Sequence, residues 1–308
     1  MIDNLFTVFQ QVLILFLLMG AGYIFNKAKV LDKNSCKKIS DIVVTYVAPC
    51  VIIKSFIRDY DASMMKMLFL ALAFSALLHV FMIASSKLVI KMPDDKKRRV
   101  AVYATVFSNA GFVALPLQEA ILGGDGVFYG AAYIVIFNIA MWSFGVVEMS
   151  GDKTMVTPKK LLVSPGIIGV VVGVIIFAFS IKPPFVVTSV LSYMSALNVP
   201  LPMFVIGYHL AETDILHAFK EKDLYFSMLL RMIVYPFAAI LILKLLGVES
   251  VLAIALAIAV SSPVGATVSM FSEKFGSDTE FSVKLVSVST LISIITMPLL
   301  IAFAQMIF

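Results

Sequence analysis

Stretches of about 20 mostly apolar residues follow one another along nearly the whole chain. A helix of that length spans a hydrocarbon core of roughly 30 Å, and in lipid only helices and closed barrels satisfy their own backbone polar groups. Of the 308 residues, 61% are hydrophobic and only 14% are charged, and the mean hydropathy is +1.01. So little charge cannot cover a water-soluble protein of this length. The sequence therefore predicts an all-α polytopic protein of the lipid bilayer.

We predict ten transmembrane helices joined by short connections, near residues 5–25, 39–57, 66–90, 100–122, 127–148, 161–181, 187–211, 224–246, 250–272 and 281–307. The first of them lacks a basic leading segment and a small-residue cleavage site, so we expect a retained helix and not a signal peptide. The only cysteines are Cys36 and Cys50, which predict neither a disulfide framework nor a cysteine metal site. We expect no cofactor and no metal.

Lysine and arginine gather in alternate connections. The five odd-numbered connections carry eighteen of them, whereas the even-numbered ones carry only Arg58, Lys66 and Lys182. Because positive loops mark the cytoplasmic side, we expect the odd-numbered connections in the cytoplasm and both termini outside a plasma or inner membrane. The net charge of +5 is spread over loops that flank the membrane, so it predicts a topology and no nucleic-acid partner.

An internal repeat divides the chain into residues 1–155 and 156–308. Residues 107–123, FSNAGFVALPLQEAILG, align with residues 260–276, VSSPVGATVSMFSEKFG, at an offset of 153. The second helix of each half carries a proline, Pro49 and Pro200, at an offset of 151. Since five is an odd number, a second set of five helices enters the membrane in the opposite sense. We therefore predict two inverted five-helix repeats.

Helix-breaking residues occupy corresponding places in the two halves. Gly111 and Pro116 lie in the fourth predicted helix, and the run Ser-Ser-Pro-Val-Gly at 261–265 lies in the ninth. Proline removes a backbone hydrogen bond, and a freed backbone group in lipid must be satisfied by protein or by a water-filled cavity. Paired interruptions in inverted halves indicate the midplane site of a transporter. Alternatively, Pro116 and Pro263 only kink ordinary packed helices, in which proline and glycine are frequent.

The same residues resemble the auxin efflux carrier family, which includes the plant PIN-type auxin carriers and bacterial malate or malonate permeases. Asn109, Gly111-Phe112 and Pro116-Leu117 resemble the fourth-helix pattern of the family. PMFVIGYHLAETDI at 202–215 resembles its seventh helix, and SSPVGATVSMFSEKFG at 261–276 its ninth. The resemblance covers nearly the full chain, including a short central loop.

This resemblance implies a fold similar to sodium/proton antiporters and bile acid transporters. Helices 1, 2, 6 and 7 of such a fold form a scaffold, and helices 3–5 and 8–10 form a transport core in which helices 4 and 9 cross. The resemblance also implies an organic anion bound near the crossing and a homodimer formed through the scaffold. Plant members carry an acid–base pair early in helix 3. The third predicted helix here offers Lys66 and no acid, so coupling through such a pair is not expected.

Several polar residues inside predicted helices have two interpretations. Asn138 and Asn198 either line the site or bond a neighbouring helix. Arg231, at an offset of 152 from His79, could attract the anion, or it could snorkel or pair inside the protein, and we favour a structural role for both residues. Glu119 and Glu148 lie toward helix ends, where we expect water. The predicted substrate-binding residues are Asn109, Gly111, Pro116, Ser261, Ser262, Pro263, Gly265, Asn138, Asn198, Pro49 and Pro200.

These features predict a secondary transporter that moves a small organic anion, a carboxylate, by alternating access. Neutral donors would recognise the anion, because Lys274 is the only basic residue in the two interrupted segments and lies at the end of one of them. Three alternatives stay open: a cation-coupled dicarboxylate symporter, a channel and, from another class, an intramembrane enzyme. The chain contains no HExxH, GxSxG or Walker lysine motif that would favour an enzyme or an ATP-driven pump.

Overall fold

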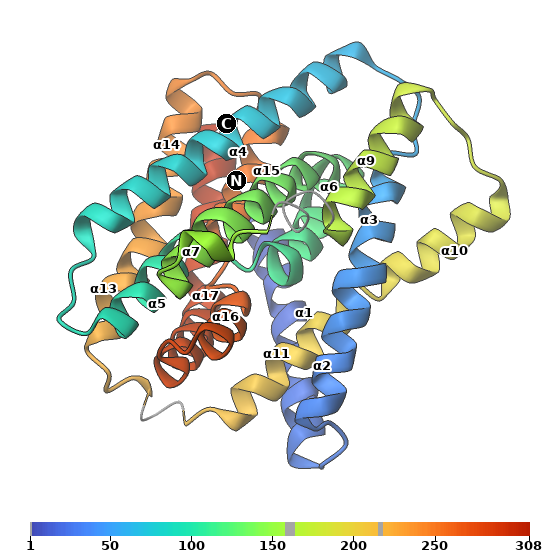
Figure 1. The fold of residues 1–308 in the computed structure, drawn as a ribbon. Coiled ribbons are helices and arrows are strands. Elements are labelled where there is room, and N and C mark those ends of the chain that lie inside the picture. The colour runs from blue at the N-terminus through green and yellow to red at the C-terminus, as the bar shows by residue number, and fades with distance from the viewer. Residues whose placement is uncertain (1, 158–163, 215–217) are drawn as a thin grey trace.

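The computed structural model describes residues 2–157, 164–214 and 218–308, and Figure 1 shows that these are helical almost throughout. The helices of the first half are α1 (Ile2–Lys27), α2–η1–α3 (Lys33–Ser55), α4 (Ala62–Val89), α5 (Asp95–Val106) and η2–α6–η3–α7 (Ala110–Ser150), followed by a short 3-10 turn, η4 (Lys153–Met155). Those of the second half are α9 (Pro165–Ala178), α10 (Phe185–Ala196), α11 (Pro200–Glu212), α13–η5–α14 (Asp223–Leu245), α15 (Ser250–Ser261), α16 (Thr267–Phe275) and α17 (Thr279–Ile307).

Among the described residues, six helical stretches are long and apolar enough to cross a membrane: Phe9–Lys27, Ala62–Val89, Ala110–Ser150, Phe185–Glu212, Asp223–Leu245 and Thr279–Ile307. Shorter apolar helices lie at Pro165–Ala178 and Ser250–Ser261. All ten predicted ranges overlap helical residues, and residues 161–163 of the sixth range lie outside the described residues. The predicted all-helical membrane protein is confirmed, and its division into inverted repeats stays a prediction.

The longest stretch, Ala110–Ser150, consists of two arms that meet at Gly123. Gly123 has φ 61° and ψ −148°, which no helical residue adopts. A Cβ on Gly130 would lie 2.1 Å from Gln118 Oε1, although in a continuous helix these two positions would be about 18 Å apart. The chain therefore folds back at Gly123, in agreement with two predicted helices that end at 122 and begin at 127.

Aspartate and glutamate side chains fix where several helices begin. Asp32 accepts from Ser35 N at 2.7 Å and starts α2 at Lys33, six residues before the predicted boundary. Asp94 caps α5 and Glu249 caps α15 in the same way. Such a cap satisfies N–H groups that have no partner within the helix, so the polar residue at the membrane surface sets the start of each apolar segment.

Helix contacts fall into two sets. In one, α11 packs against α1 and α2, and α3 packs against α9 and α10. In the other, α6 packs against α4 and α15, and α17 packs against α15 and α16. Figure 1 shows α2, α3, α9 and α10 on one side of the view and α5, α13, α16 and α17 on the other. The two sets meet where α1 contacts α17 and α6 contacts α9.

Two glycines bring α1 and α11 into backbone contact. A Cβ on Gly22 would lie 2.3 Å from Phe204 O, and a Cβ on Gly207 would lie 1.9 Å from Met19 O. Small residues allow helices in a membrane to approach this closely, and dispersion contacts then hold them together. Any larger residue at either position would force the two helices apart.

Polar contacts join the odd-numbered connections to one another. Asn26 Nδ2 donates to Glu212 Oε1 at 2.7 Å, which joins the first connection to the seventh. Lys97 Nζ lies 2.9 Å from Glu221 Oε1, which joins the third connection to the same seventh one. Ser277 Oγ donates to Met149 O at 3.2 Å. The loops that share the positive charge therefore lie on one side of the molecule.

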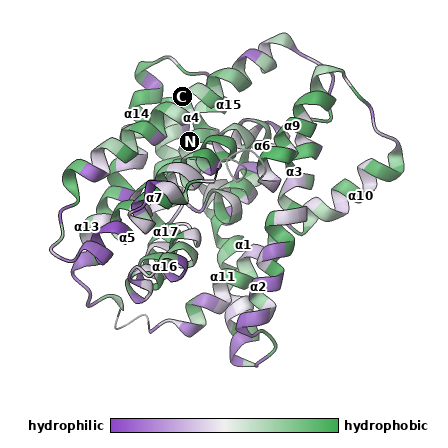
Figure 2. Ribbon diagram, viewed as in Figure 1, coloured by the Kyte–Doolittle hydropathy of each residue, from purple (hydrophilic) through white to green (hydrophobic). Residues whose placement is uncertain are grey.

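The even-numbered connections meet on the opposite side. Arg58 pairs with Asp125, and Lys182 Nζ lies 2.9 Å from Asp59 Oδ1. Figure 2 shows hydrophilic residues gathered at helix ends and in loops, with hydrophobic residues along the helices between them. The chain is therefore a multi-pass membrane protein with two polar rims.

Candidate functional site

The first interruption separates α5 from η2. The Phe107 N–H still donates to Tyr103 O at 3.0 Å, but the Phe107 backbone is extended, with ψ 105°. Asn109 then has φ −79° and ψ 57°, and a helical backbone resumes at Ala110. The helical ladder therefore stops for three residues in the middle of an apolar segment.

The second interruption separates α15 from α16 and follows from Pro263. The residue before a proline is pushed out of the helical region, and Ser262 accordingly has φ −65° and ψ 150°. Proline also cannot donate to the preceding turn, so α15 ends at Ser261. The helix resumes at Thr267.

The two interruptions cross and bond to each other. Ser108 and Val264 form an isolated antiparallel bridge. Asn109 N donates to Pro263 O at 2.8 Å, and Gly265 N donates to Phe107 O at 3.0 Å. These bonds satisfy backbone groups that the interruptions would otherwise leave unpaired in the bilayer.

Gly265 permits the close approach of the two chains at this crossing. A Cβ at this position would lie 2.9 Å from Ser108 O and 3.2 Å from Ser108 C, both backbone atoms. Gly111 differs, because a Cβ there would meet nothing within 4 Å. One predicted glycine is therefore required by packing, and the other faces open space.

The prediction that Pro116 interrupts its helix is wrong. Pro116 lies within a continuous helical segment that begins at Ala110, six residues before the proline. The π-helical turn η2 (Ala110–Ala114) directly precedes it. A proline ring clashes with the carbonyl four residues earlier, and here that carbonyl belongs to Phe112, inside the wider π turn.

The same arrangement recurs at two other prolines. The π turn η1 (Val43–Val47) precedes Pro49, and η5 (Leu230–Val234) precedes Pro236. In each case the proline lies two residues after the turn, at the first or second position of the following α-helix. These helices therefore absorb a proline by widening one turn instead of breaking.

The accessible residues of the crossing are the first turns of the two resumed helices. Gly111, Phe112, Ala266 and Thr267 are half-buried, whereas residues 113–118 and 261–265 are buried. The first helical bonds from these ends are donated by residues beyond them, such as Val113 N to Asn109 O at 3.0 Å. Helix N-termini carry partial positive charge and unpaired N–H groups, so two of them converge on one place.

Polar side chains at the crossing lack partners among the described residues. Asn109 is 6% exposed, and its Nδ2 has no hydrogen-bond acceptor. Ser261 is fully buried and its Oγ has no partner, whereas Ser262 Oγ donates to Ile258 O at 3.0 Å. Val264 N donates to Ser289 Oγ at 3.1 Å. Asn109 and Ser261 therefore retain unused donors, whereas the Ser262 hydroxyl has already used its single donor.

The other predicted site residues lie on neighbouring helices. Asn138 Nδ2 donates to Ile134 O at 2.8 Å and faces Gly166 of α9. Pro49 also packs on α9, because a Cβ on Gly169 would lie 3.0 Å from Pro49 Cα. These contacts connect both residues to α9 and not to the crossing.

Asn198 and Pro200 lie where the seventh predicted helix divides into α10 and α11. Asn198 is fully buried, and both of its amide atoms lack partners among the described residues. Pro200 opens α11, which contacts η2 beside the crossing. Asn198 is therefore a second buried amide with unused capacity, on a helix that adjoins the site.

Arg231 is a buried charged residue that forms hydrogen bonds with both helices of the crossing. It is fully buried, and Nη2 donates to Val260 O at 2.5 Å and to Ser262 O at 2.9 Å. Its Nη1 donates to Thr105 O at 3.4 Å. The structural role favoured for Arg231 is confirmed, and of the two forms considered it pairs inside the protein; the sequence did not indicate that its partners are the carbonyls of both interrupted helices.

Gln118 was not predicted as part of the site. It is 1% exposed, and its Nε2 donates to Ala255 O at 2.8 Å, so it connects α6 to α15. Gly130 leaves room for this amide. An amide in an apolar segment, with a glycine on the next helix, is a signal that could have indicated such a contact.

His79 lies next to the crossing on α4. Its Nδ1 lies 2.8 Å from Ser75 O, and its ring centroid is 4.8 Å from that of Tyr133. Tyr133 OH lies 3.3 Å from Ser108 Oγ. This aromatic contact links α4 to the interruption in the fourth helix, so His79 packs inside the protein, as favoured above.

The prediction that water surrounds Glu148 is wrong. Its side chain is only 5% exposed and lies between two cations, with Oε2 3.3 Å from Lys87 Nζ and Oε1 3.2 Å from Arg98 Nη1. Both partners reach the polar rim, so the carboxylate at the end of the fifth helix is buried by basic side chains from α4 and α5.

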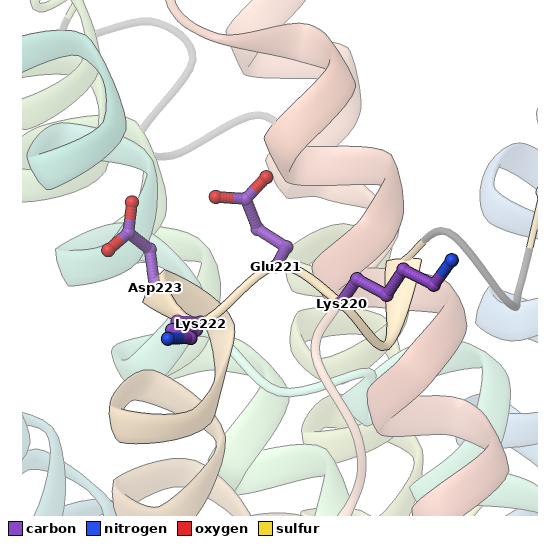
Figure 3. A pocket seen from close by; sticks show the side chains of 4 residues that line it. All are labelled: Lys220, Glu221, Lys222 and Asp223. Carbon is purple, nitrogen blue, oxygen red and sulfur yellow. The ribbon is translucent and has the colours of Figure 1, made fainter.

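A hollow of about 350 Å³ on the same rim is lined by Lys220, Glu221, Lys222 and Asp223 (Figure 3). Figure 3 shows the two carboxylates turned to the same side and Lys220 pointing away from them. Lys97 Nζ donates to Glu221, and this hydrogen bond is the main reason that the pKa of Glu221 lies below its usual value. The hollow therefore adjoins a set of ion pairs and is distinct from the crossing.

No group of three or more His, Cys, Asp or Glu side chains within the described residues could hold a metal ion. Apolar spanning helices and two interrupted helices that cross define the class of a polytopic membrane transport protein. The family model described as a membrane transport protein matches residues 7–156 and 152–301. The chain therefore belongs to this family of membrane transport proteins, the auxin efflux carrier family.

A relative with the same broad activity covers nearly the whole chain. An uncharacterised transporter of Methanothermobacter thermautotrophicus is 22% identical over 294 residues, which make up 94% of this chain and 96% of the relative. The similarity extends over both halves, so the transporter assignment applies to the full length.

Proposed function

We propose that the protein is a secondary carrier that moves a small organic anion, a carboxylate, across the membrane by alternating access, with the helix crossing as its binding site. One observation carries the proposal: the half-buried residues of the crossing are the first turns of two helices. Free N–H groups and the positive ends of helix dipoles bind anions without any charged side chain.

The Asn109 amide completes this recognition. Its Nδ2 is buried without an acceptor among the residues that the structure describes, and an anion that leaves water must replace hydrogen bonds from its hydration shell. Ser261 offers a further hydroxyl. Neutral donors suit a carrier, because a fixed charge at the site would hold the anion too tightly for release.

The inverted repeat of residues 1–155 and 156–308 is part of the proposal. Its support is the pair Gly123 and Gly276, which align in sequence and have φ 61° and 69° at corresponding helix ends. The two sets of helix contacts support a scaffold of helices 1, 2, 6 and 7 and a transport core of the others. Movement of the core along the scaffold would expose the crossing to each side in turn.

The location is proposed from sequence. The rim that carries Lys97 and Glu221 faces the cytoplasm under the positive-inside rule, which leaves both termini outside the plasma or inner membrane. The homodimer through the scaffold rests on the family resemblance. Family membership favours transport over the intramembrane enzyme considered above.

The test is uptake by purified protein in liposomes, offered a panel of labelled monocarboxylates and dicarboxylates together with matched organic cations. We expect uptake of one or more carboxylates and none of the cations. Binding of the best carboxylate is then measured by calorimetry. Losing one amide donor to a charged ligand costs about 1.5–3 kcal/mol, so Asn109→Ala should bind roughly 10- to 100-fold more weakly.

Asn109→Asp should bind more weakly still, because a carboxylate at this position repels the anion. Asn34→Asp adds the same charge at an exposed position in the first connection and serves as the control, which should bind as the wild type does. Wild-type affinity in Asn109→Asp would mean that the site lies elsewhere or that the substrate is not an anion.

A further inference from the structure

The carbonyl groups at the crossing belong to the C-terminal ends of two helices. Thr105 lies one residue before the end of α5, and Val260 lies one residue before the end of α15. Ser262 O follows directly within the second interruption. The last carbonyls of a helix have no partner within it, and each C-terminus carries about half a negative elementary charge.

One guanidinium group satisfies these carbonyls. Arg231 extends from the π turn η5 and donates to Thr105 O, Val260 O and Ser262 O at 3.4, 2.5 and 2.9 Å. Its Nε also donates to Ser262 O at 3.2 Å, and its Nη1 lies 3.9 Å from Met82 Sδ of α4. Two C-termini contribute about one negative charge between them, and Arg231 contributes one positive charge that protein environments do not remove.

This arrangement leaves no carboxylate to balance Arg231. None of the ion pairs formed by the described residues includes it. Ionisable residues within a membrane pair with one another or with backbone carbonyls. Arg231 pairs with backbone carbonyls, and these belong to both interrupted helices. Its charge is therefore matched by the helix ends themselves.

Carbonyls of this kind bind the coupling ion in many carriers. In transporters with interrupted helices, unwound carbonyls and half-helix C-termini coordinate Na⁺ or H⁺, while the N-termini face the anionic substrate. Here the corresponding carbonyls already engage a covalently attached cation. A second cation would meet both occupied ligands and the repulsion of the guanidinium group.

We propose that Arg231 is a built-in counter-cation, which occupies the place of a coupling ion and makes the carrier independent of Na⁺ and K⁺. The consequence for ion coupling rests on the proposed function. The occupancy of the carbonyls is tested without any organic anion. For the cation-coupled symporter left open by the sequence, the proposal excludes Na⁺ and K⁺ as the coupling ion.

The test is thermal unfolding of the purified full-length protein in detergent, in NaCl, KCl or choline chloride of equal ionic strength. The wild-type midpoint should be the same in all three salts. Arg231→Ala should unfold at a lower temperature, and millimolar methylguanidinium or Na⁺ should raise its midpoint by roughly 2–4 °C relative to choline. The emptied set of carbonyls would then accept a free cation.

Two variants act as controls. Arg58→Ala removes a guanidinium that pairs with Asp125 on the polar rim, and methylguanidinium should not raise the unfolding midpoint of this variant. Arg231→Lys keeps the charge but reaches fewer carbonyls, so its midpoint should fall between those of wild type and Arg231→Ala, without a response to Na⁺. If Arg231→Ala cannot be purified folded, Arg231→Lys and the wild type in the three salts decide the question.

A wild-type midpoint or carboxylate uptake that rises with Na⁺ or K⁺ would overturn the proposal, as would equal recovery of Arg231→Ala in choline. Loss of carboxylate binding in the Asn109 experiment bears on the substrate alone. A protein that fails that experiment but shows the expected cation responses would lose its proposed substrate and keep its counter-cation.

Discussion

Gly265 is the residue on which the closeness of the crossing depends. Gly265→Ala places a Cβ 2.9 Å from Ser108 O, so the bridge must open or the two chains must shift. We expect a loss of about 1–3 kcal/mol in the free energy of unfolding, as for other overpacked sites. Thermal unfolding in detergent measures it.

Gly111→Ala is the matched control for that substitution. Its Cβ meets nothing within 4 Å, and alanine favours a helix over glycine by about 1 kcal/mol, so stability should not fall. A drop in the unfolding temperature of Gly111→Ala as large as that of Gly265→Ala would contradict the geometry of the crossing.

Glu148 illustrates a buried charge held by partly exposed partners. Glu148→Gln removes the carboxylate between Lys87 and Arg98, while both cations can still turn toward water. We therefore expect a loss of about 1–3 kcal/mol, below the 3–5 typical of fully buried pairs. Asp95→Asn, whose pairs are exposed, should cost about 0–1 kcal/mol. Equal losses in both variants would show that burial of Glu148 contributes nothing.

At the scale of single elements, the two prolines of the interrupted helices differ. Pro263 is at the interruption, and its carbonyl accepts from Asn109 N. Pro263→Ala allows α15 to continue and should reduce carboxylate uptake at equal expression. Pro116→Ala leaves the interruption at Phe107–Asn109 unchanged and should transport normally, with its π turn relaxed to an α turn. Equal loss of uptake in both variants would indicate that transport needs Pro116 as much as Pro263, and would contradict this distinction.

The position of each interruption could be predicted from the sequence to within several residues, because glycine and proline act on the backbone locally. Pro263 broke its helix as expected. Pro116 did not, since a π turn accommodates the ring, and whether a helix widens or breaks depends on what its neighbours can satisfy.

The partners of Arg231 could not be predicted in the same way. They are three carbonyls from two helices that are separated by more than a hundred residues in sequence. Every residue has a backbone carbonyl, so the residue types at positions 105 and 260 do not indicate that their carbonyls bind Arg231. Gln118 is similar, because its acceptor is a backbone atom of Ala255.

At the scale of the whole molecule, the grouping of loops gives a test of orientation. With Cys36 and Cys50 replaced, single cysteines at Asn34 and Lys153 should react with a membrane-impermeant thiol reagent only from the cytoplasmic side. A cysteine at Gly124 should react only from outside. All three positions are exposed. Reaction of Lys153→Cys from outside would reverse the orientation drawn from the charge count.

The interlocked glycines of α1 and α11 also set an order of events during synthesis. Asn26 and Glu212, at the ends of these helices, are 186 residues apart in the chain. At roughly 5–20 residues per second, about 10–40 s pass between the making of one helix and the arrival of the other. During that interval the surface of α1 at Gly22 must contact lipid or another protein of the membrane, because Phe204 is not yet in place. The N-terminal helix therefore lacks its packing partner until α11 has been made. A chain that ends before Gly207 would leave α1 without the helix against which it packs.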